Sequence, residues 1–184
     1  MAKLSGVAWA AHNLGLAACF GGQLFGKIAL NANLDVLENE EDRGRLLNTA
    51  WNRYNLVNAA SFGTAAVTWF PGRLGLSGKE IDQQTRNLVL AKDILIAAGA
   101  LTGLASVVQG RALAGQAPGG AVPIETGTTP SSRTPEKAAT LLRSVNLLGN
   151  VNLAIQGGII GVTSILAMKS SESARFGALS RLLP

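Results

Sequence analysis

The sequence predicts an all-α integral membrane protein, folded as a four-helix bundle. Only 15% of its 184 residues are charged and 47% are hydrophobic, whereas charged residues make up about a quarter of an ordinary soluble domain. Four apolar stretches, about 6–30, 50–70, 91–113 and 138–168, approach or exceed the roughly 20 residues with which a helix crosses a bilayer. We therefore expect residues 1–168 to form one four-span membrane domain and residues 169–184 to form a basic tail. The alternative is a soluble bundle of alanine-rich helices.

The first apolar stretch is predicted to be a retained span. Lys3 provides little of the basic start of a signal peptide, and the stretch is longer than the 7–15 residues of a usual signal core. His12, Asn13 and Gln23 interrupt a segment otherwise built from Leu, Ala, Phe and Gly. Cys19 is the only cysteine, which excludes an intrachain disulfide and a multi-cysteine metal site, and we expect it to act as a small apolar residue.

The second helix is expected to begin outside the bilayer. Five acidic residues lie between Asp35 and Asp42, which is typical of a solvated loop or a short surface helix. The text "GRLLNTAWNRYN" then continues into the second apolar stretch without a break. Pro71 and Gly72 are expected to end this helix.

The third helix is predicted to begin near Gly78. Ser77 and Glu80 have the spacing of a capping box, in which the hydroxyl and the carboxylate each satisfy a backbone N–H group. Lys92 and Asp93 fall near the start of the apolar part. We expect both to be interfacial anchors, a role also predicted for three aromatic residues: Trp51, Tyr54 and Trp69.

A long Pro/Gly-rich loop, residues 115–135, is expected to precede the fourth helix. Its text, "GQAPGGAVPIETGTTPSSRTP", predicts a segment that neither packs a core nor forms a helix. Thr134 is expected to be the N-cap, with Pro135 in the first turn. A helix from there to Met168 would rise about 50 Å, so its first turns should lie outside the hydrocarbon. The basic tail could lie on a membrane surface or be solvated.

The charges do not decide the orientation. An even number of spans puts both termini on one side, and each side then carries eight Lys and Arg residues, so the positive-inside rule returns a tie. Seven of the eleven acidic residues fall on the side opposite the termini. On that basis we expect the termini in the cytoplasm and the protein in the inner membrane of a bacterial cell.

Helical periodicity predicts which side chains face the bundle interior, at about 100° per residue. In the first and second helices the interior residues are predicted to be His12, Gly15, Cys19, Gly22, Gln23, Gly26, Asn48, Asn52, Asn55, Ala59, Phe62 and Ala66. In the fourth helix they are predicted to be Asn146, Gly149, Asn150, Gln156, Gly157, Gly161 and Ser164. A lipid-facing arc is predicted for Leu147, Leu148, Val151, Ile155, Ile159, Val162, Ile165 and Leu166.

Glycine spacing supports close helix packing. Small residues four apart let membrane helices approach each other. Three glycine pairs have this spacing: Gly22/Gly26, Gly99/Gly103 and Gly157/Gly161. Gly15 is a further packing glycine on the predicted interior face of the first helix, and Ala59/Gly63 is a weaker pair with the same spacing.

The sequence predicts a non-catalytic structural or accessory subunit of a membrane assembly. It contains no Walker loop, GxSxG or HExxH motif and no paired buried carboxylates. The basic residues are dispersed despite the net charge of +5, which disfavours nucleic acid as a partner. We expect the lipid bilayer, other membrane proteins or a second copy of the chain as partners, and we expect no metal site.

The alternative is a small carrier or binding pocket for a quinone or another lipophilic ligand. Its candidate residues are His12, Gln23, Tyr54, Asn55, Asn146 and Asn150, because a carbonyl head group prefers neutral donors in an apolar cleft. Haem is a further possibility, but one histidine supplies only one axial ligand per chain.

The texts "VAWAAHNLGLAACFGGQLFGKIAL" and "EDRGRLLNTAWNRYN" resemble small uncharacterised four-helix integral membrane proteins of bacteria, in particular of actinobacteria. The resemblance covers the first two apolar stretches best and fades in the Pro/Gly-rich loop and the tail. It implies a membrane class and carries no activity or site residues.

Overall fold

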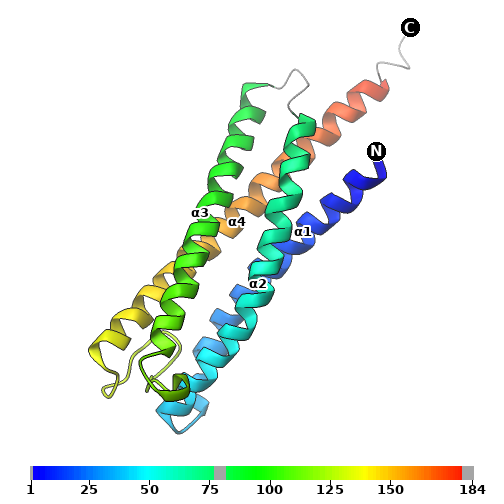
Figure 1. The fold of residues 1–184 in the computed structure, drawn as a ribbon. Helices are drawn as coiled ribbons and strands as arrows, with labels where there is room; N and C mark the ends of the chain where they lie inside the picture. The colour runs from blue at the N-terminus through cyan, green and yellow to red at the C-terminus, as the bar shows by residue number, and fades with distance from the viewer. Residues whose placement is uncertain (1, 77–81, 180–184) are drawn as a thin grey trace.

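Four long helices make up most of the structure, a computed structural model that describes residues 2–76 and 82–179 (Figure 1). They are α1 (Ala2–Phe25), α2 (Glu40–Leu76), α3 (Gln83–Ala114) and α4 (Glu136–Leu179). The described residues contain no strand beyond one isolated bridge between Ile124 and Pro130. The predicted all-α, four-helix fold is confirmed.

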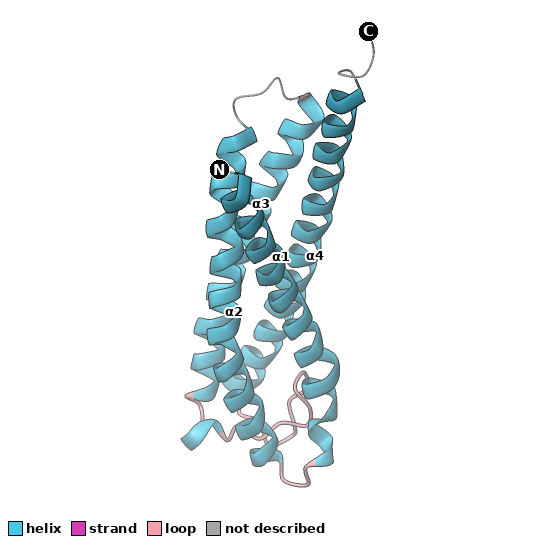
Figure 2. Ribbon diagram, turned by 90° about the vertical axis from the view of Figure 1, so that its right-hand side faces the viewer, coloured by secondary structure: helices cyan, strands magenta, loops and turns pink. Residues whose placement is uncertain are grey.

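The helices form two hairpins. α1 packs closely along α2 and α3 along α4, whereas contacts between the two hairpins are sparser. Both termini lie at one end of the bundle, and residues 26–39 and 115–135 lie at the other (Figure 1). We call these two segments together the cap; Figure 2 shows their loops gathered below the helices.

Two helices, rather than the expected four, are long and apolar enough to cross a membrane by length and composition. They are α3 and the Glu136–Lys169 part of α4. α1 and α2 do not meet the same test among the described residues. Both carry polar side chains at short intervals, such as His12, Asn13 and Gln23 in α1, and these lower the hydropathy of any window that could span the bilayer.

Three helix ends differ from the predictions. Pro71 does not end α2, which continues to Leu76; a proline removes one helical hydrogen bond and can be accommodated as a kink. Thr134 does not cap α4, which begins at Glu136: its hydroxyl oxygen accepts from the Ser131 amide at 2.8 Å and donates to the Pro123 carbonyl at 2.6 Å, and so holds the loop instead. The Ser77–Glu80 capping box lies outside the described residues, and the described part of α3 is instead capped by Asp82, which accepts from the Thr85 amide at 2.7 Å.

The Pro/Gly-rich loop packs a core, contrary to the prediction. Val122 and Ile124 are buried in a cluster whose other members are Leu34, Leu47, Leu113, Ala138 and Leu142. Gly44 allows the loop to approach α2, because a Cβ there would collide with the Val122 carbonyl. Val122 and Ile124 thus contribute apolar contacts to the docking of a segment whose composition is typical of disorder, and Gly44 leaves room for them.

Polar contacts hold the cap on its outer side. The Arg133 guanidinium lies 3.0 Å from a carboxylate oxygen of Glu40 and 2.9 Å from one of Glu41. A hydrogen bond from Ser131, and then the Arg133 cation, lower the pKa of Glu40. The ionised form of Glu40 therefore favours the closed cap.

Candidate functional site

A cavity lies between the two hairpins, next to the cap. It has a volume of about 120 Å³, and all four helices contribute to its walls. Its polar lining consists of Gln23, Lys27, Asn31, Asn48, Asn52, Asn55, Asn58, Ser106, Asn146 and Asn152. Carboxamides therefore dominate the polar lining of the described cavity.

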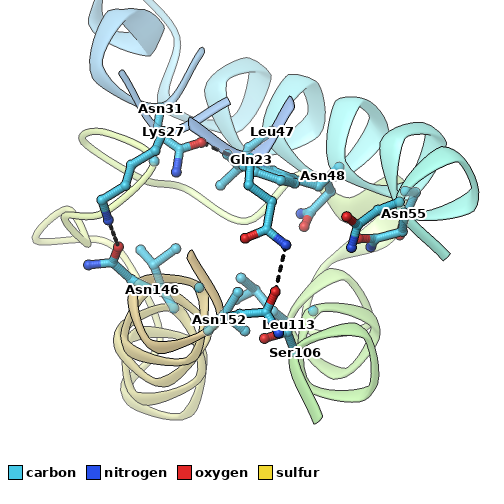
Figure 3. Close-up of a pocket in the computed structure, with 18 of the residues that line it drawn as sticks. Gln23, Lys27, Asn31, Leu47, Asn48, Asn55, Ser106, Leu113, Asn146 and Asn152 are labelled. Atoms are coloured by element: carbon cyan, nitrogen blue, oxygen red, sulfur yellow. Dashed lines mark hydrogen bonds between the residues drawn. The ribbon is translucent and has the colours of Figure 1, made fainter. Parts of the chain in front are cut away.

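Two hydrogen bonds close the side of the cavity between α1 and α4. Gln23 donates from Nε2 to the Asn152 side-chain oxygen at 2.8 Å. One turn further along, in the short π-helix Gly26–Leu30 that continues α1 into the cap, Lys27 donates from Nζ to the Asn146 side-chain oxygen at 3.1 Å. Figure 3 shows both side chains reaching across the cavity toward α4. The predicted interior positions of Gln23 and Asn146 are confirmed.

The interior face of α4 is rotated from the predicted one. Asn152 is 3% exposed, whereas Asn150 is exposed and does not line the cavity. Asn152 donates to the Gly99 carbonyl at 2.9 Å and to the Thr102 hydroxyl at 2.8 Å on α3, and it accepts from Gln156 at 2.6 Å. Asn152, which faces α3 and α1, was therefore missing from the predicted interior residues of α4, whereas Asn150 was wrongly included.

The same rotation corrects other assignments on α4. Gly161 and Ser164, predicted inside, are exposed. Ile159 and Leu166, predicted to face lipid, are buried, and Ile155 packs against the same core. Leu147, Val151 and Ile165 are exposed as predicted.

The α2 wall presents a row of asparagines to the cavity. Asn48 is buried and donates to the Gly120 carbonyl of the cap at 2.7 Å. Asn55 is half-buried, and Asn52 is exposed at the rim. Asn58, which was not among the predicted residues, has a buried side-chain oxygen without a hydrogen-bond partner. Of the predicted α2 stripe, Ala59 is exposed and takes no part.

The α3 wall is built from three small residues and, at its cap end, Leu113. Gly103, Ser106 and Gly110 line the cavity, and because their side chains are short or absent they leave space facing the asparagines of α2. The Ser106 hydroxyl is buried and has no hydrogen-bond partner. Buried polar groups are normally paired. Of the four buried side-chain atoms without a hydrogen-bond partner among the described residues, those of Gln109 and Gln156 lie outside the cavity lining, whereas those of Asn58 on α2 and Ser106 on α3 belong to it and indicate a place for a polar ligand.

The packing glycines are confirmed in α1 and partly elsewhere. A Cβ on Gly15 would lie 2.5 Å from the Ser61 carbonyl, and those on Gly22 and Gly26 would collide with Tyr54 and Trp51. In the other helices Gly99 lies against Phe62, Gly103 against Asn152 and Gly157 against Phe20, while Gly161 and Gly63 face open space. At most of the glycines that have a close neighbour, the space that a Cβ would occupy is bordered by an aromatic side chain rather than by the backbone of another helix.

Tyr54 and His12 do not belong to the cavity. The Tyr54 hydroxyl lies 3.0 Å from each of the Ala18 and Cys19 carbonyls, so it ties α2 to α1. His12 lies toward the other end of α1, where both ring nitrogens are engaged: Nδ1 with the Ala65 carbonyl at 2.7 Å and Nε2 with Lys92 Nζ at 2.8 Å. No ring nitrogen is left free for an axial bond to haem.

Lys92 is a core residue, not an interfacial anchor. Its side chain is 0% exposed. The Ala65 carbonyl can only accept a hydrogen bond, so the His12 Nδ1 atom that faces it carries the imidazole proton. The other ring nitrogen, Nε2, is then an acceptor, and Lys92 donates to it. Its Nζ lies 3.8 Å from the Trp69 ring centroid. Trp69 is itself 2% exposed, so it is not an interfacial anchor either.

Asp93 supports this cluster from outside. It accepts from the Trp69 indole N–H at 2.8 Å and pairs with Arg73 at 3.1 Å. Lys92 and Asp93 thus have different partners, as the geometry of adjacent helical residues predicts. The cluster joins the hairpins at the end of the bundle opposite the cap.

Comparison with known proteins finds no matching family model, no similar curated protein and no similar solved structure. The resemblance to bacterial four-helix membrane proteins remains a prediction.

Of the six predicted ligand-site residues, the structure brings Gln23, Asn55 and Asn146 together at the cavity. It leaves His12, Tyr54 and Asn150 outside. The sequence prediction missed Lys27, Asn58, Ser106 and Asn152 as site residues. The signal for Lys27 was available, because it lies one turn beyond Gln23 on the same face of α1.

Proposed function

We propose that this protein is an integral membrane protein that binds a lipophilic molecule with a polar head group in the cavity between its hairpins. This is the alternative that the sequence left open beside an accessory-subunit role. The observation that carries it is a carboxamide-lined cavity with two unpartnered buried groups, on Asn58 and Ser106. Leaving such groups unsatisfied costs about 1–3 kcal/mol each, and a bound head group would satisfy them.

Exposed apolar side chains support the membrane location. In the most apolar windows of α3 and α4 only 11% and 28% of the residues are buried, whereas a core helix of a soluble protein would be mostly buried. α1 and α2 also present large apolar residues outward, among them Leu14, Phe25, Leu56 and Val67. Soluble monomers seldom expose so much contiguous apolar surface, and lipid would cover it.

Ligand binding can be tested by blocking the cavity. The full-length protein would be extracted gently from its own membrane and examined by native mass spectrometry. Ser106→Leu places a leucine side chain at the α3 wall of the cavity. Ala97→Leu, the control, places the same side chain at an exposed position of α3. We expect a small-molecule adduct on the wild type and on Ala97→Leu, and a loss of adduct in Ser106→Leu. Absence of an adduct from the wild type, or retention in Ser106→Leu, would contradict the proposal.

A second function, an accessory subunit of a membrane assembly, is favoured by one observation. α3 carries an exposed apolar stripe that includes Leu90, Ile94, Leu101, Leu104 and Val108, which a neighbouring membrane protein could cover as well as lipid. Native spectra in which other polypeptides remain bound, with no small adduct, would favour this second function.

A further inference from the structure

The charge of the cavity narrows the class of ligand. Lys27 is the only ionisable residue among the described residues that line it. The three acidic residues in the first turn of α2 are engaged elsewhere, since Glu40 and Glu41 pair with Arg133 and Asp42 pairs with Arg45. The acidic residues of the cap itself, Asp35, Glu38 and Glu125, do not line the cavity. Within the described cavity wall, no carboxylate therefore offsets the positive charge of Lys27.

Lys27 is placed to contact a ligand. Its side chain is half-buried, and the hydrogen bond from its Nζ goes to a neutral amide oxygen, that of Asn146. An ammonium group has three N–H donors, so this bond leaves capacity for an anionic oxygen on the cavity side. Figure 3 shows the side chain crossing from the end of α1 to α4 along one edge of the cavity.

The unpartnered groups add a second requirement. The free oxygen of Asn58 can only accept a hydrogen bond, and the Ser106 hydroxyl can donate or accept. A quinone presents carbonyl oxygens alone and would leave the Asn58 oxygen unsatisfied, as would a fatty-acid carboxylate. A head group that carries both an anionic oxygen and hydroxyl groups offers an acceptor to Lys27, a donor to the Asn58 oxygen and either role to the Ser106 hydroxyl.

The acyl chains would leave the cavity between α2 and α3, where contacts between the helices are sparse. Hydrogen bonds close the cavity between α1 and α4, whereas none among the described residues joins α2 to α3 beside it. The α3 wall there consists of Gly103, Ser106 and Gly110, with Leu113 at its cap end. A lipid could therefore keep its head group near Lys27 and extend its chains between α2 and α3 into the bilayer.

We propose that the cavity binds a phospholipid with an anionic, hydroxyl-bearing head group of the phosphoglycerol type, and that Lys27 is the counter-ion of its phosphate. This inference rests on the proposed function and specifies its ligand. It requires no covalent step, because binding consists of one charge-assisted hydrogen bond and several bonds to amides.

The test is a lipid titration of the full-length protein in detergent, followed by native mass spectrometry. The probes are phosphatidylglycerol, phosphatidylcholine and ubiquinone. The variants are Lys27→Gln, which can still donate to Asn146, Lys27→Arg, which keeps the charge, and Arg53→Gln, which removes an exposed cation of α2 that does not line the cavity. Thermal unfolding of each variant in the same detergent reports whether the fold is retained.

We expect the wild type to prefer phosphatidylglycerol over both other probes. Lys27→Gln should lose about tenfold in affinity for phosphatidylglycerol, as expected for one charge-assisted hydrogen bond, with little change toward phosphatidylcholine. Lys27→Arg should restore the preference, and Arg53→Gln should keep it.

Equal binding of the three probes by the wild type, or an unchanged preference in Lys27→Gln, would overturn the head-group inference. The proposed function would stand in that case, provided that Ser106→Leu still abolished binding. Failure of the wild type to bind any of the probes, together with the absence of a native adduct, would overturn both proposals.

Discussion

Replacing His12 by phenylalanine should destabilise the bundle, because it removes the one hydrogen-bond acceptor that, within the described part of the chain, contacts the buried amine of Lys92. Phenylalanine preserves the ring that stacks on Trp9, at a centroid distance of 5.5 Å, so the change removes hydrogen bonds more than volume. The Ala65 carbonyl keeps the Thr68 hydroxyl as a neighbour at 3.3 Å. The group left without a hydrogen-bond partner is therefore mainly the amine of Lys92, whose side chain is 0% exposed.

The expected magnitude follows from this burial. A buried polar group without a partner costs about 1–3 kcal/mol and a charged one more, so we expect His12→Phe to lower the free energy of unfolding by roughly 2–4 kcal/mol. Lys92→Met in the same chain removes the stranded amine, so the double variant should be more stable than His12→Phe alone. The coupling energy should be about 1–3 kcal/mol.

Reversible unfolding in mixed micelles of a mild detergent and sodium dodecyl sulfate, followed by circular dichroism, measures these differences. Asn13→Phe is the matched control, because its side chain is exposed on the same helix and should change stability by no more than about 0.5 kcal/mol. The reasoning is refuted if His12→Phe unfolds like the control. Strict additivity of His12→Phe and Lys92→Met would refute the pairing itself.

Three further changes test the rest of the structure. Asn152→Leu should destabilise the bundle by about 1–3 kcal/mol and Asn150→Leu by less than about 0.5 kcal/mol in the same unfolding assay; the reverse order would contradict the observed face of α4. Gly44→Ala should expose residues 115–135 to limited proteolysis, because the added methyl group collides with the loop backbone, whereas Gly63→Ala, which faces open space, should leave the digestion pattern unchanged. The pKa of Glu40 is lowered in the folded protein, so the contribution of its carboxylate is present above the unfolded pKa of about 4.3 and is lost as the pH falls through the folded value. Proteolysis of the cap should accordingly rise at acidic pH, and Glu40→Gln should weaken that dependence; identical pH profiles for Glu40→Gln and the wild type would exclude this carboxylate as the cause.

The sequence determined the four helices and the interior face of α1. Long apolar stretches separated by acidic or Pro/Gly-rich segments leave little freedom in where helices form. On α1, His12, Gly15 and Cys19 fall on one arc and are all buried, as is Gly26 directly after it, because the polar groups and the small residues agree on the same face. Where two independent signals coincide, periodicity suffices.

Only the tertiary structure decided which asparagine of α4 faces inward and where the cavity lies. Asn150 and Asn152 are two residues apart and point in nearly opposite directions around the helix, so one face cannot hold both. The choice depends on Gln23 and Thr102, which come from helices distant in the sequence. A single-helix pattern carries no information about such partners.

The same reason explains Lys92 and the cap. A lysine near the end of an apolar stretch is normally assigned to the interface, and here the assignment fails because His12, eighty residues away, offers an acceptor inside the bundle. The loop at residues 115–135 has a composition typical of disorder, yet it docks because Gly44 leaves room for its backbone. Helix formation is encoded locally, whereas the pairing of buried polar groups is fixed only when distant segments meet.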